Sequence, residues 1–452
     1  MLTALAFGMV IVFMTLIMTK RLSPITALIL VPIAFGAVAG FRAEMGPMML
    51  AGIGKLAPTG VMLMFAILYF AVMIESGLFE PLVRVLVRVV HDDPVRIVVG
   101  SAALALVVSL DGDGSTTYMI VTAAMLPLYR RLGLKPVILA CVTMMAGGVM
   151  NVTPWGGPTA RASSALGIDA SEIFLPMIPA LLVSAAFVLW AAYRLGLTER
   201  NRLAAGPPLR ETSPRDAAPR EASALTDDSM LGPATRADDP DRPPRHLVLN
   251  ALLTVALMTA LVLGVLPLPV LFMIAFAVAL VLNVPSVGEQ KALLARHAGN
   301  VLAVVGLIFA AGVFTGILSG TKMVDAMADS VVALVPAPLG PYLPVLTGLL
   351  SIPFTFFISN DAFYYGVLPI LAKAGAAYGI SAAEMGRAAI IGQPVHLLSP
   401  LVPSTYLLVG LVGIDFGDHQ RFTLKWCVLT SLVMLAAGLL TAVIPWVGRA
   451  AG

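Results

Sequence analysis

Long runs of apolar residues follow one another along the chain, separated by shorter polar segments. A helix needs about 20 mainly apolar residues to cross the hydrocarbon core of a bilayer, and most of these runs reach or approach that length. They fall at about 1–19, 24–40, 58–77, 136–163 and 172–194, and again at about 247–265, 267–284, 301–319, 384–412 and 423–447. The pattern predicts an all-α polytopic membrane protein with about five spans in each half.

A polar segment interrupts one further apolar stretch in each half, between the third and fourth predicted spans. In the first half it reads SLDGDGSTTY (109–118), and in the second half FISNDAFYYG (357–366). Ionisable side chains and non-helical backbone at membrane depth are tolerated where they line a cavity. We therefore expect two re-entrant hairpins, at about 97–128 and 341–371, whose tips contribute to a binding site.

Composition agrees with a membrane protein, since 59% of the residues are hydrophobic, 12% are charged and the mean hydropathy is +0.95. Soluble domains carry about 25% charged residues. The net charge of +3 is too small and too scattered to indicate a nucleic-acid partner. Cys141 and Cys427 both lie in apolar runs, which gives neither a disulfide framework nor a metal-ligand spacing.

The segment 197–246 differs from the rest of the chain because it holds eight Arg, nine Asp or Glu and eight Pro, with few large apolar side chains. Such a composition buries too little apolar surface to fold alone. We interpret it as a disordered cytoplasmic linker between a first membrane repeat, 1–196, and a second repeat, 247–452.

The two halves resemble each other, as in LYFA (68–71) and LIFA (307–310). With five spans per half, the second copy must enter the membrane upside down, and inverted repeats with interrupted segments are typical of secondary transporters. If the first helix runs inward, 21 of the 28 Lys and Arg lie on the inner face. The positive-inside rule then places both termini outside.

Hydroxyl and amide side chains at the polar interruptions are candidate ligands for a carboxylate substrate, because broken helices expose N–H and hydroxyl donors at depth. Prolines and glycines also break the fourth predicted span at 154–159 and its counterpart in 392–405. Alternatively, single hydroxyls only cap helix ends or bind carbonyl groups one turn back. The candidates are Ser115, Thr116, Thr117, Asn151, Thr153, Ser359, Asn360, Ser399, Ser404 and Thr405.

Three carboxylates, Asp111, Asp113 and Asp361, occur within the two polar segments. They would repel a bare polyanion, so they favour a substrate that arrives with a metal ion, or entry coupled to a cation. We expect all three as ligands of that metal, with Asp113 and Asp361 also candidates for proton coupling. Alternatively, one or two of them only cap short helices. No resident cofactor is expected.

Three further ionisable residues lie in or beside predicted spans. Arg161, just after the first break, either holds a carboxylate or extends to the outer surface. His396 is the only histidine within a predicted span, and it is either a proton-coupling group or a core residue. Glu75 is interpreted as a solvated helix end, and the other histidines as loop residues.

Five stretches together resemble the bacterial citrate-metal-proton symporters, the CitMHS family of the ion transporter superfamily. The stretches are LIMTKRLSP (16–24), APTGVMLMFAILYF (57–70), SLDGDGSTTYMI (109–120), GGVMNVTPWGGPTARA (147–162) and ISNDAFYYG (358–366). The resemblance implies import of citrate complexed with Mg²⁺ or Ca²⁺, driven by protons, across the bacterial inner membrane. It also implies an elevator-type fold of two inverted repeats, usually as a homodimer.

One departure limits the resemblance to the wider superfamily, whose dicarboxylate carriers bear a Ser-Asn-Thr tip on both hairpins. Here only Ser359 and Asn360 remain, followed by Asp361, which argues against sodium coupling and a dicarboxylate. The alternatives are a cation/proton antiporter or an oxyanion carrier of the same superfamily. A more remote one is an intramembrane aspartyl protease, although its Tyr-Asp motif does not occur.

Overall fold

The computed structural model describes residues 2–19, 21–81, 83–85, 93–112, 114–205, 246–334, 336 and 338–448. Every regular element in these ranges is helical. The first half contains α1 (Leu2–Met18), α2 (Pro24–Val38), α3 (Met45–Glu75), α5 (Pro94–Val108), η1 (Ser109–Asp111), α6 (Gly114–Arg131), α7 (Pro136–Met150), α8 (Gly157–Leu166) and α9 (Ala170–Ala205). The second contains α10 (Leu247–Val262), α11 (Leu268–Asn283), α12 (Val287–Gly320), α13 (Met323–Leu334), η4 (Gly340–Tyr342), α14 (Leu343–Phe357), η5 (Ala362–Val367), α15 (Leu368–Ala376), α16 (Ala382–Ala389), η6 (Ile390–Gly392), α17 (Gln393–His396), α18 (Pro403–Val412) and α19 (Phe416–Leu440).

The helices follow the predicted apolar runs closely. Five described segments are long and apolar enough to cross a membrane, namely α3, α9, α12, Gly340–Phe357 and α19, and seven shorter apolar helices accompany them. The protein is therefore a multi-pass membrane protein. Two spans begin earlier than predicted, α3 at Met45 instead of about 58 and α12 at Val287 instead of about 301. Polar residues such as Lys55 and Gln290 dilute the hydropathy of these first turns without ending the helix.

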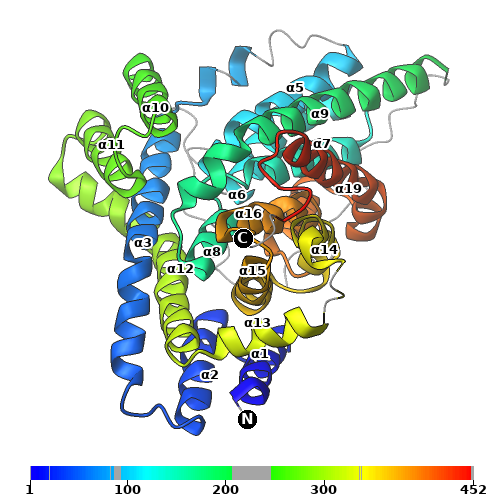
Figure 1. The fold of residues 1–452 in the computed structure, drawn as a ribbon. Helices are drawn as coiled ribbons and strands as arrows, with labels where there is room; N and C mark the ends of the chain where they lie inside the picture. Colours follow the sequence, from blue (N-terminus) through cyan, green and yellow to red (C-terminus); the bar gives the residue numbers. More distant parts are fainter. Residues whose placement is uncertain are drawn as a thin grey trace.

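Helices α3 and α12 lie side by side, with α10 and α11 flanking the upper part of α3 in Figure 1. Their crossing depends on glycine. A Cβ on Gly52 would overlap the carbonyl oxygen of Gly312, and one on Gly316 would overlap that of Met48. Small residues four apart let helix backbones approach closely in membranes, where apolar burial from water does not drive association. This pair therefore joins the two halves through direct backbone contact.

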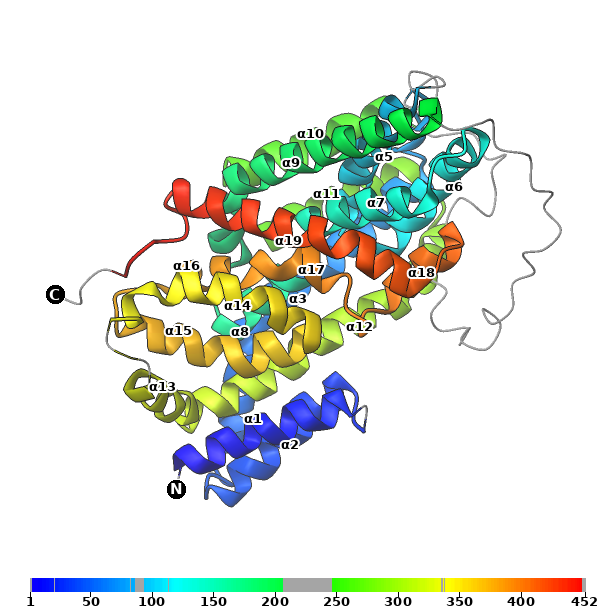
Figure 2. The same ribbon diagram turned by 90° about the vertical axis from the view of Figure 1, so that its right-hand side faces the viewer.

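Most of the remaining helices form a second group beside this pair (Figures 1 and 2), whereas α1, α2 and α13 lie at the lower end of the pair in Figure 1. Helices α5, α7, α9 and α19 pack against one another, and α8 and α14 to α18 lie between them and α12. Each predicted hairpin is a pair of helices joined at its polar segment, α5 with α6 and α14 with α15. Each of the predicted broken spans is also interrupted, between α7 and α8 and between α17 and α18. The same order of hairpin and broken helix thus occurs in both halves.

Helix α9 continues to Ala205, past the predicted start of the linker at 197. Its last turns are held by Glu199, whose carboxylate is 2% exposed and accepts hydrogen bonds from Arg202 at 2.7 Å and from the Lys135 backbone at 3.1 Å. Arg202 also donates to the carbonyl of Gly133 at 2.6 Å. The α6–α7 turn therefore supports this end of α9, which composition alone did not indicate. Residues 206–245 lie outside the described ranges.

Candidate functional site

The two hairpin tips and the two helix breaks meet around one cavity of about 460 Å³. The first tip contributes Ser109, Gly112 and Gly114, and the second tip contributes residues 359–361. Asn151 lies at the first break, and residues 401–404 belong to the second. Four chain segments from opposite halves therefore share a single site.

The first tip is shaped by a glycine and a tryptophan. Gly112 has a φ of +78°, a left-handed conformation that favours glycine, and it ends the short helix η1. Trp155, from the first break, donates its indole N–H to the carbonyl of Leu110 at 2.8 Å. Its ring also packs against Phe70 of α3 and Phe272 of α11, with centroid distances of 5.6 and 5.1 Å. Trp155 thus connects this tip to α3 and α11.

The second tip is an interrupted helix. Its chain leaves α14 at Ile358, which has an extended conformation, and resumes in the π-helix η5. The Ser359 hydroxyl accepts the backbone N–H of Ala362 at 3.2 Å and so caps the new helix. Asn360 and Asp361 consequently stand at a helix start that faces the cavity.

Gln393 connects three parts of the site through hydrogen bonds, although its side chain is fully buried. Its Oε1 accepts from the Asn151 amide at 3.3 Å, which links the two helix breaks. Its Nε2 donates to Asn360 Oδ1 at 3.2 Å and to the Tyr364 hydroxyl at 2.8 Å. Helices α7 and α17 also pack closely beside the Asn151–Gln393 bond, because a Cβ on Gly148 would lie 2.5 Å from Pro394 Cα.

An ion pair crosses the cavity between residues 200 positions apart. Arg161 Nε lies 2.6 Å from Asp361 Oδ1, with the side chains 24% and 13% exposed. The sequence left two interpretations for Arg161, and the structure agrees with the one in which its guanidinium holds a carboxylate. That carboxylate is the protein's own. Arg161 is also the only Lys or Arg among the described residues that line the cavity.

Half of the predicted substrate ligands line the cavity, namely Thr117, Asn151, Ser359, Asn360 and Ser404. The other five do not line it: Ser115, Thr116, Thr153, Ser399 and Thr405. Ser399 donates to the carbonyl of Phe356 at 2.7 Å, and Thr405 donates to that of Leu397. Both hydroxyls therefore satisfy backbone carbonyls, but those carbonyls lie 43 and 8 residues away in the sequence rather than one turn back.

The predicted metal ligands are only partly described. The side chain of Asp111 and the whole of Asp113 lie outside the described residues, which leaves Asp361 as the one predicted ligand whose side chain is placed. Within the described ranges, no three His, Cys, Asp or Glu side chains gather closely enough to hold a metal ion. The metal role of the three aspartates therefore stays a prediction.

His396 lines the cavity and donates its Nδ1–H to the carbonyl of Thr355 at 2.6 Å. A neutral ring bonded in this way keeps its proton on Nδ1, so Nε2 is the nitrogen that can accept another proton. The predictions for two other histidines were wrong, because His297 is a buried residue of α12 and His419 is buried in the first turn of α19.

The prediction that Glu75 is a solvated helix end was also wrong. Its carboxylate binds Arg296 at 2.7 Å and His297 at 2.9 Å, which joins the end of α3 to α12.

Two polar residues of the site were not among the candidates. Gln393 lies within the predicted broken span, where a buried amide in an apolar helix could have indicated it. Ser109 lines the cavity, and neither its hydroxyl nor that of Thr117 has a hydrogen-bond partner among the described residues. Buried hydroxyls are usually paired, so these two are unsatisfied polar groups of residues that line the cavity.

Comparison with known proteins gives consistent results. The family model CitMHS, described as citrate transporter, matches residues 13–392. The chain is 56% identical over 444 residues to a Bacillus subtilis (strain 168) protein named citrate transporter, covering 98% of this chain and 100% of that relative. It is 51% identical over 445 residues to the Mg(2+)/citrate complex secondary transporter of the same organism, covering 98% and 99%.

Solved structures share the fold at low sequence identity. The YdaH transporter of Alcanivorax borkumensis matches with a TM-score of 0.58 and 18% identity, over 89% of each chain. MtrF of Neisseria gonorrhoeae, which represents a class of antimetabolite efflux pumps, matches with a TM-score of 0.60 and 13% identity, over 90% of this chain and 85% of its own. At such identities the likeness extends to the fold alone.

Proposed function

Because this chain belongs to the CitMHS family of citrate transporters, we propose that it imports citrate complexed with a divalent cation, Mg²⁺ or Ca²⁺, together with protons. The observation that carries the proposal is the cavity itself. It combines hydroxyl and amide donors from both halves with one guanidinium and one carboxylate. Its volume of about 460 Å³ lies within the range of small-molecule sites.

The protein is a transporter and not an enzyme, since its relatives and its neighbours in fold are transporters. This excludes the intramembrane aspartyl protease. Among carriers, the relative named for the Mg(2+)/citrate complex supports a metal-bound substrate. The charges in the cavity support it as well. Chelation of a divalent cation leaves citrate with roughly one net negative charge, and one arginine suits such a complex better than the free trianion.

Five residues of the cavity are proposed to contact the substrate: Thr117, Asn151, Ser359, Asn360 and Ser404. The aspartates Asp111, Asp113 and Asp361 are proposed to contact its metal ion. For proton coupling the candidates are Asp113, Asp361 and His396, of which His396 offers its Nε2. Ser399 and Thr405 are assigned instead to supporting the second break through their carbonyl contacts.

The proposal extends to how the protein works as a carrier. We infer two inverted repeats, because a hairpin and a broken helix occur in the same order in each half. The α3–α12 pair would belong to a static scaffold, and the helices around the cavity to a part that moves as an elevator. A homodimer in the bacterial inner membrane, with both termini outside, completes the proposed arrangement.

Uptake of radiolabelled citrate tests the function directly. Cells that express the protein are assayed with Mg²⁺, with Ca²⁺ and with excess EDTA, each with and without a protonophore. The expected result is uptake that requires both a divalent cation and the proton gradient, and that exceeds uptake by cells carrying an empty vector. Equal uptake in EDTA would contradict the metal complex, and equal uptake with the protonophore would contradict proton coupling. Absence of citrate uptake in every condition would favour cation/proton antiport or oxyanion transport.

A further inference from the structure

The Arg161–Asp361 pair keeps hydrogen-bonding atoms of both side chains available at the cavity. Arg161 uses its Nε to contact Oδ1 of Asp361. In the part of the chain that the structure describes, the two terminal nitrogens of Arg161 and the Oδ2 of Asp361 have no hydrogen-bond partner. Both residues line the cavity. A two-nitrogen donor edge and a carboxylate oxygen therefore stand next to each other there.

The guanidinium is held by one contact and accommodated by one glycine. Asp361 holds it at Nε from the second hairpin tip, and Gly157 lies beneath it at the start of α8. A Cβ on Gly157 would come within 2.7 Å of one terminal nitrogen of Arg161, so the missing side chain makes room for the guanidinium. The open edge of an arginine binds a carboxylate through two parallel hydrogen bonds, and it loses less side-chain entropy when its orientation is already set.

We propose that the Arg161–Asp361 pair selects metal-bound citrate over free citrate, with Arg161 binding a carboxylate of the substrate and Asp361 Oδ2 facing its metal ion. This inference rests on the proposed function. A chelated citrate carries a positive centre beside its carboxylates, and the pair in the cavity has the complementary charges side by side. Each charge of the pair therefore meets its opposite in the complex.

Free citrate lacks the positive centre and meets a less favourable site. Its carboxylates would share a single guanidinium, and one of them would approach Asp361, whose charge has the same sign. Like charges in contact cost binding energy, and specificity commonly arises from such a repulsive element added to an attractive one. Asp361 therefore contributes mainly to selectivity, and Arg161 mainly to affinity.

Two substitutions separate these contributions. Asp361→Asn keeps the shape of the side chain and removes its charge, so the ratio of citrate uptake with Mg²⁺ to uptake in EDTA should fall about tenfold or more. Arg161→Lys keeps the charge and loses the two-nitrogen edge, so the KM for citrate with Mg²⁺ should rise about 10- to 100-fold, as expected for a charged hydrogen bond. Asp361→Glu keeps the negative charge, so it should retain most of the Mg²⁺ preference that Asp361→Asn loses.

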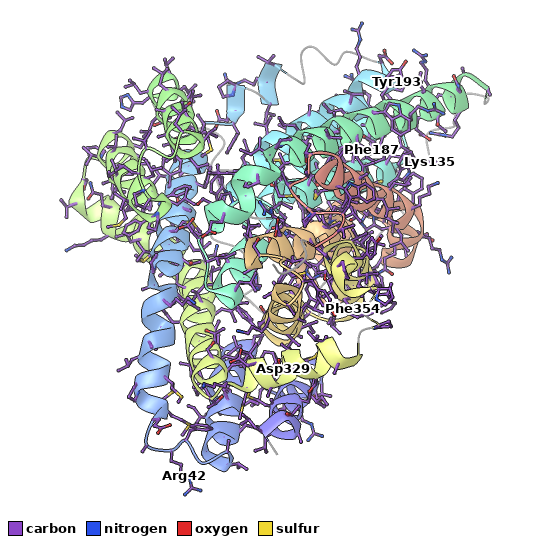
Figure 3. The ribbon with its side chains drawn as sticks, viewed as in Figure 1. Arg42, Lys135, Phe187, Tyr193, Asp329 and Phe354 are labelled. Carbon is purple, nitrogen blue, oxygen red and sulfur yellow. The ribbon has the colours of Figure 1, made fainter. Side chains whose placement is uncertain are left out.

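Matched controls come from exposed residues of the same types. Asp329 lies on α13 and Arg42 in the turn before α3 (Figure 3), and neither lines the cavity. Asp329→Asn and Arg42→Lys should keep the wild-type ratio and KM. All variants are compared at equal amounts of protein in the membrane.

An unchanged Mg²⁺ preference in Asp361→Asn, or an unchanged KM in Arg161→Lys, would overturn the inference. If Asp361→Asn transports nothing, thermal unfolding of the purified variant with citrate in Mg²⁺ and in EDTA replaces uptake. Preferential stabilisation by the Mg²⁺ mixture, equal to that of the wild type, would then also overturn it. Failure of the proposed function is distinct, because the wild-type protein itself would then take up no citrate.

Discussion

Gln393 offers a sharp test of how the two halves build one site, and Gln393→Met is the change to make. Methionine has a similar length and no amide, so it removes the hydrogen bonds with little change in packing. Three contacts of 3.3 Å or less would be lost, to Asn151, Asn360 and Tyr364. Because each neutral hydrogen bond contributes about 1 kcal/mol, we expect a loss of about 3 kcal/mol in the free energy of unfolding.

Function should suffer as well, because Asn151 and Asn360 would lose the partner that orients them toward the cavity. The expected result is a Tm lowered by several degrees for the protein in detergent, together with a KM for citrate raised several-fold. Gln290→Met is a suitable control. The Gln290 amide is part-buried in the first turn of α12 and makes one bond, to the Val284 carbonyl at 2.8 Å. A Gln393→Met protein with wild-type Tm and KM would refute the idea that this amide network positions the site.

Two other substitutions test particular contacts. Gly52→Ala should lower the Tm and the amount of protein in the membrane, because its Cβ would overlap the Gly312 carbonyl. Gly54→Ala, with nothing within 4 Å of its Cβ, should be neutral or slightly stabilising. Equal Tm values for the two variants would contradict a backbone contact at the crossing. Trp155→Phe should raise the KM a few-fold by removing the 2.8 Å bond to Leu110, whereas Trp190→Phe, 49% exposed on α9, should leave it unchanged.

The sequence was sufficient for the helices because their apolar runs and polar interruptions are local patterns. Helices are interrupted at the two polar segments and at the two breaks that glycine and proline indicated. It was harder to predict which side chains of a helix face the cavity. Thr116 and Thr117 are neighbours on α6, yet only Thr117 lines the cavity. Consecutive helical residues differ in direction by about 100°, and which one faces a site depends on the packing of other helices.

Partners distant in sequence account for the predictions that were wrong. Glu75 was interpreted as a solvated helix end from its place near the end of the third predicted span, whereas Arg296 approaches it from α12. His297 was assigned to a loop because the predicted span began four residues later. For Arg161 the residues left two interpretations open, since its partner Asp361 lies in the other half of the chain.

The backbone contact between α3 and α12 has a mechanical consequence. Where their backbones touch, around Gly52 and Gly316, the two helices bend less than either would alone, because bending one requires sliding the other along it. When the segments connected to α3 and α12 move, we expect the backbone to bend mainly where these two helices end. Both end at residues with left-handed backbone, Gly77 after α3 with a φ of +81° and Lys322 after α12 with a φ of +59°. These two joints, rather than the helices, are where we expect the chain to flex.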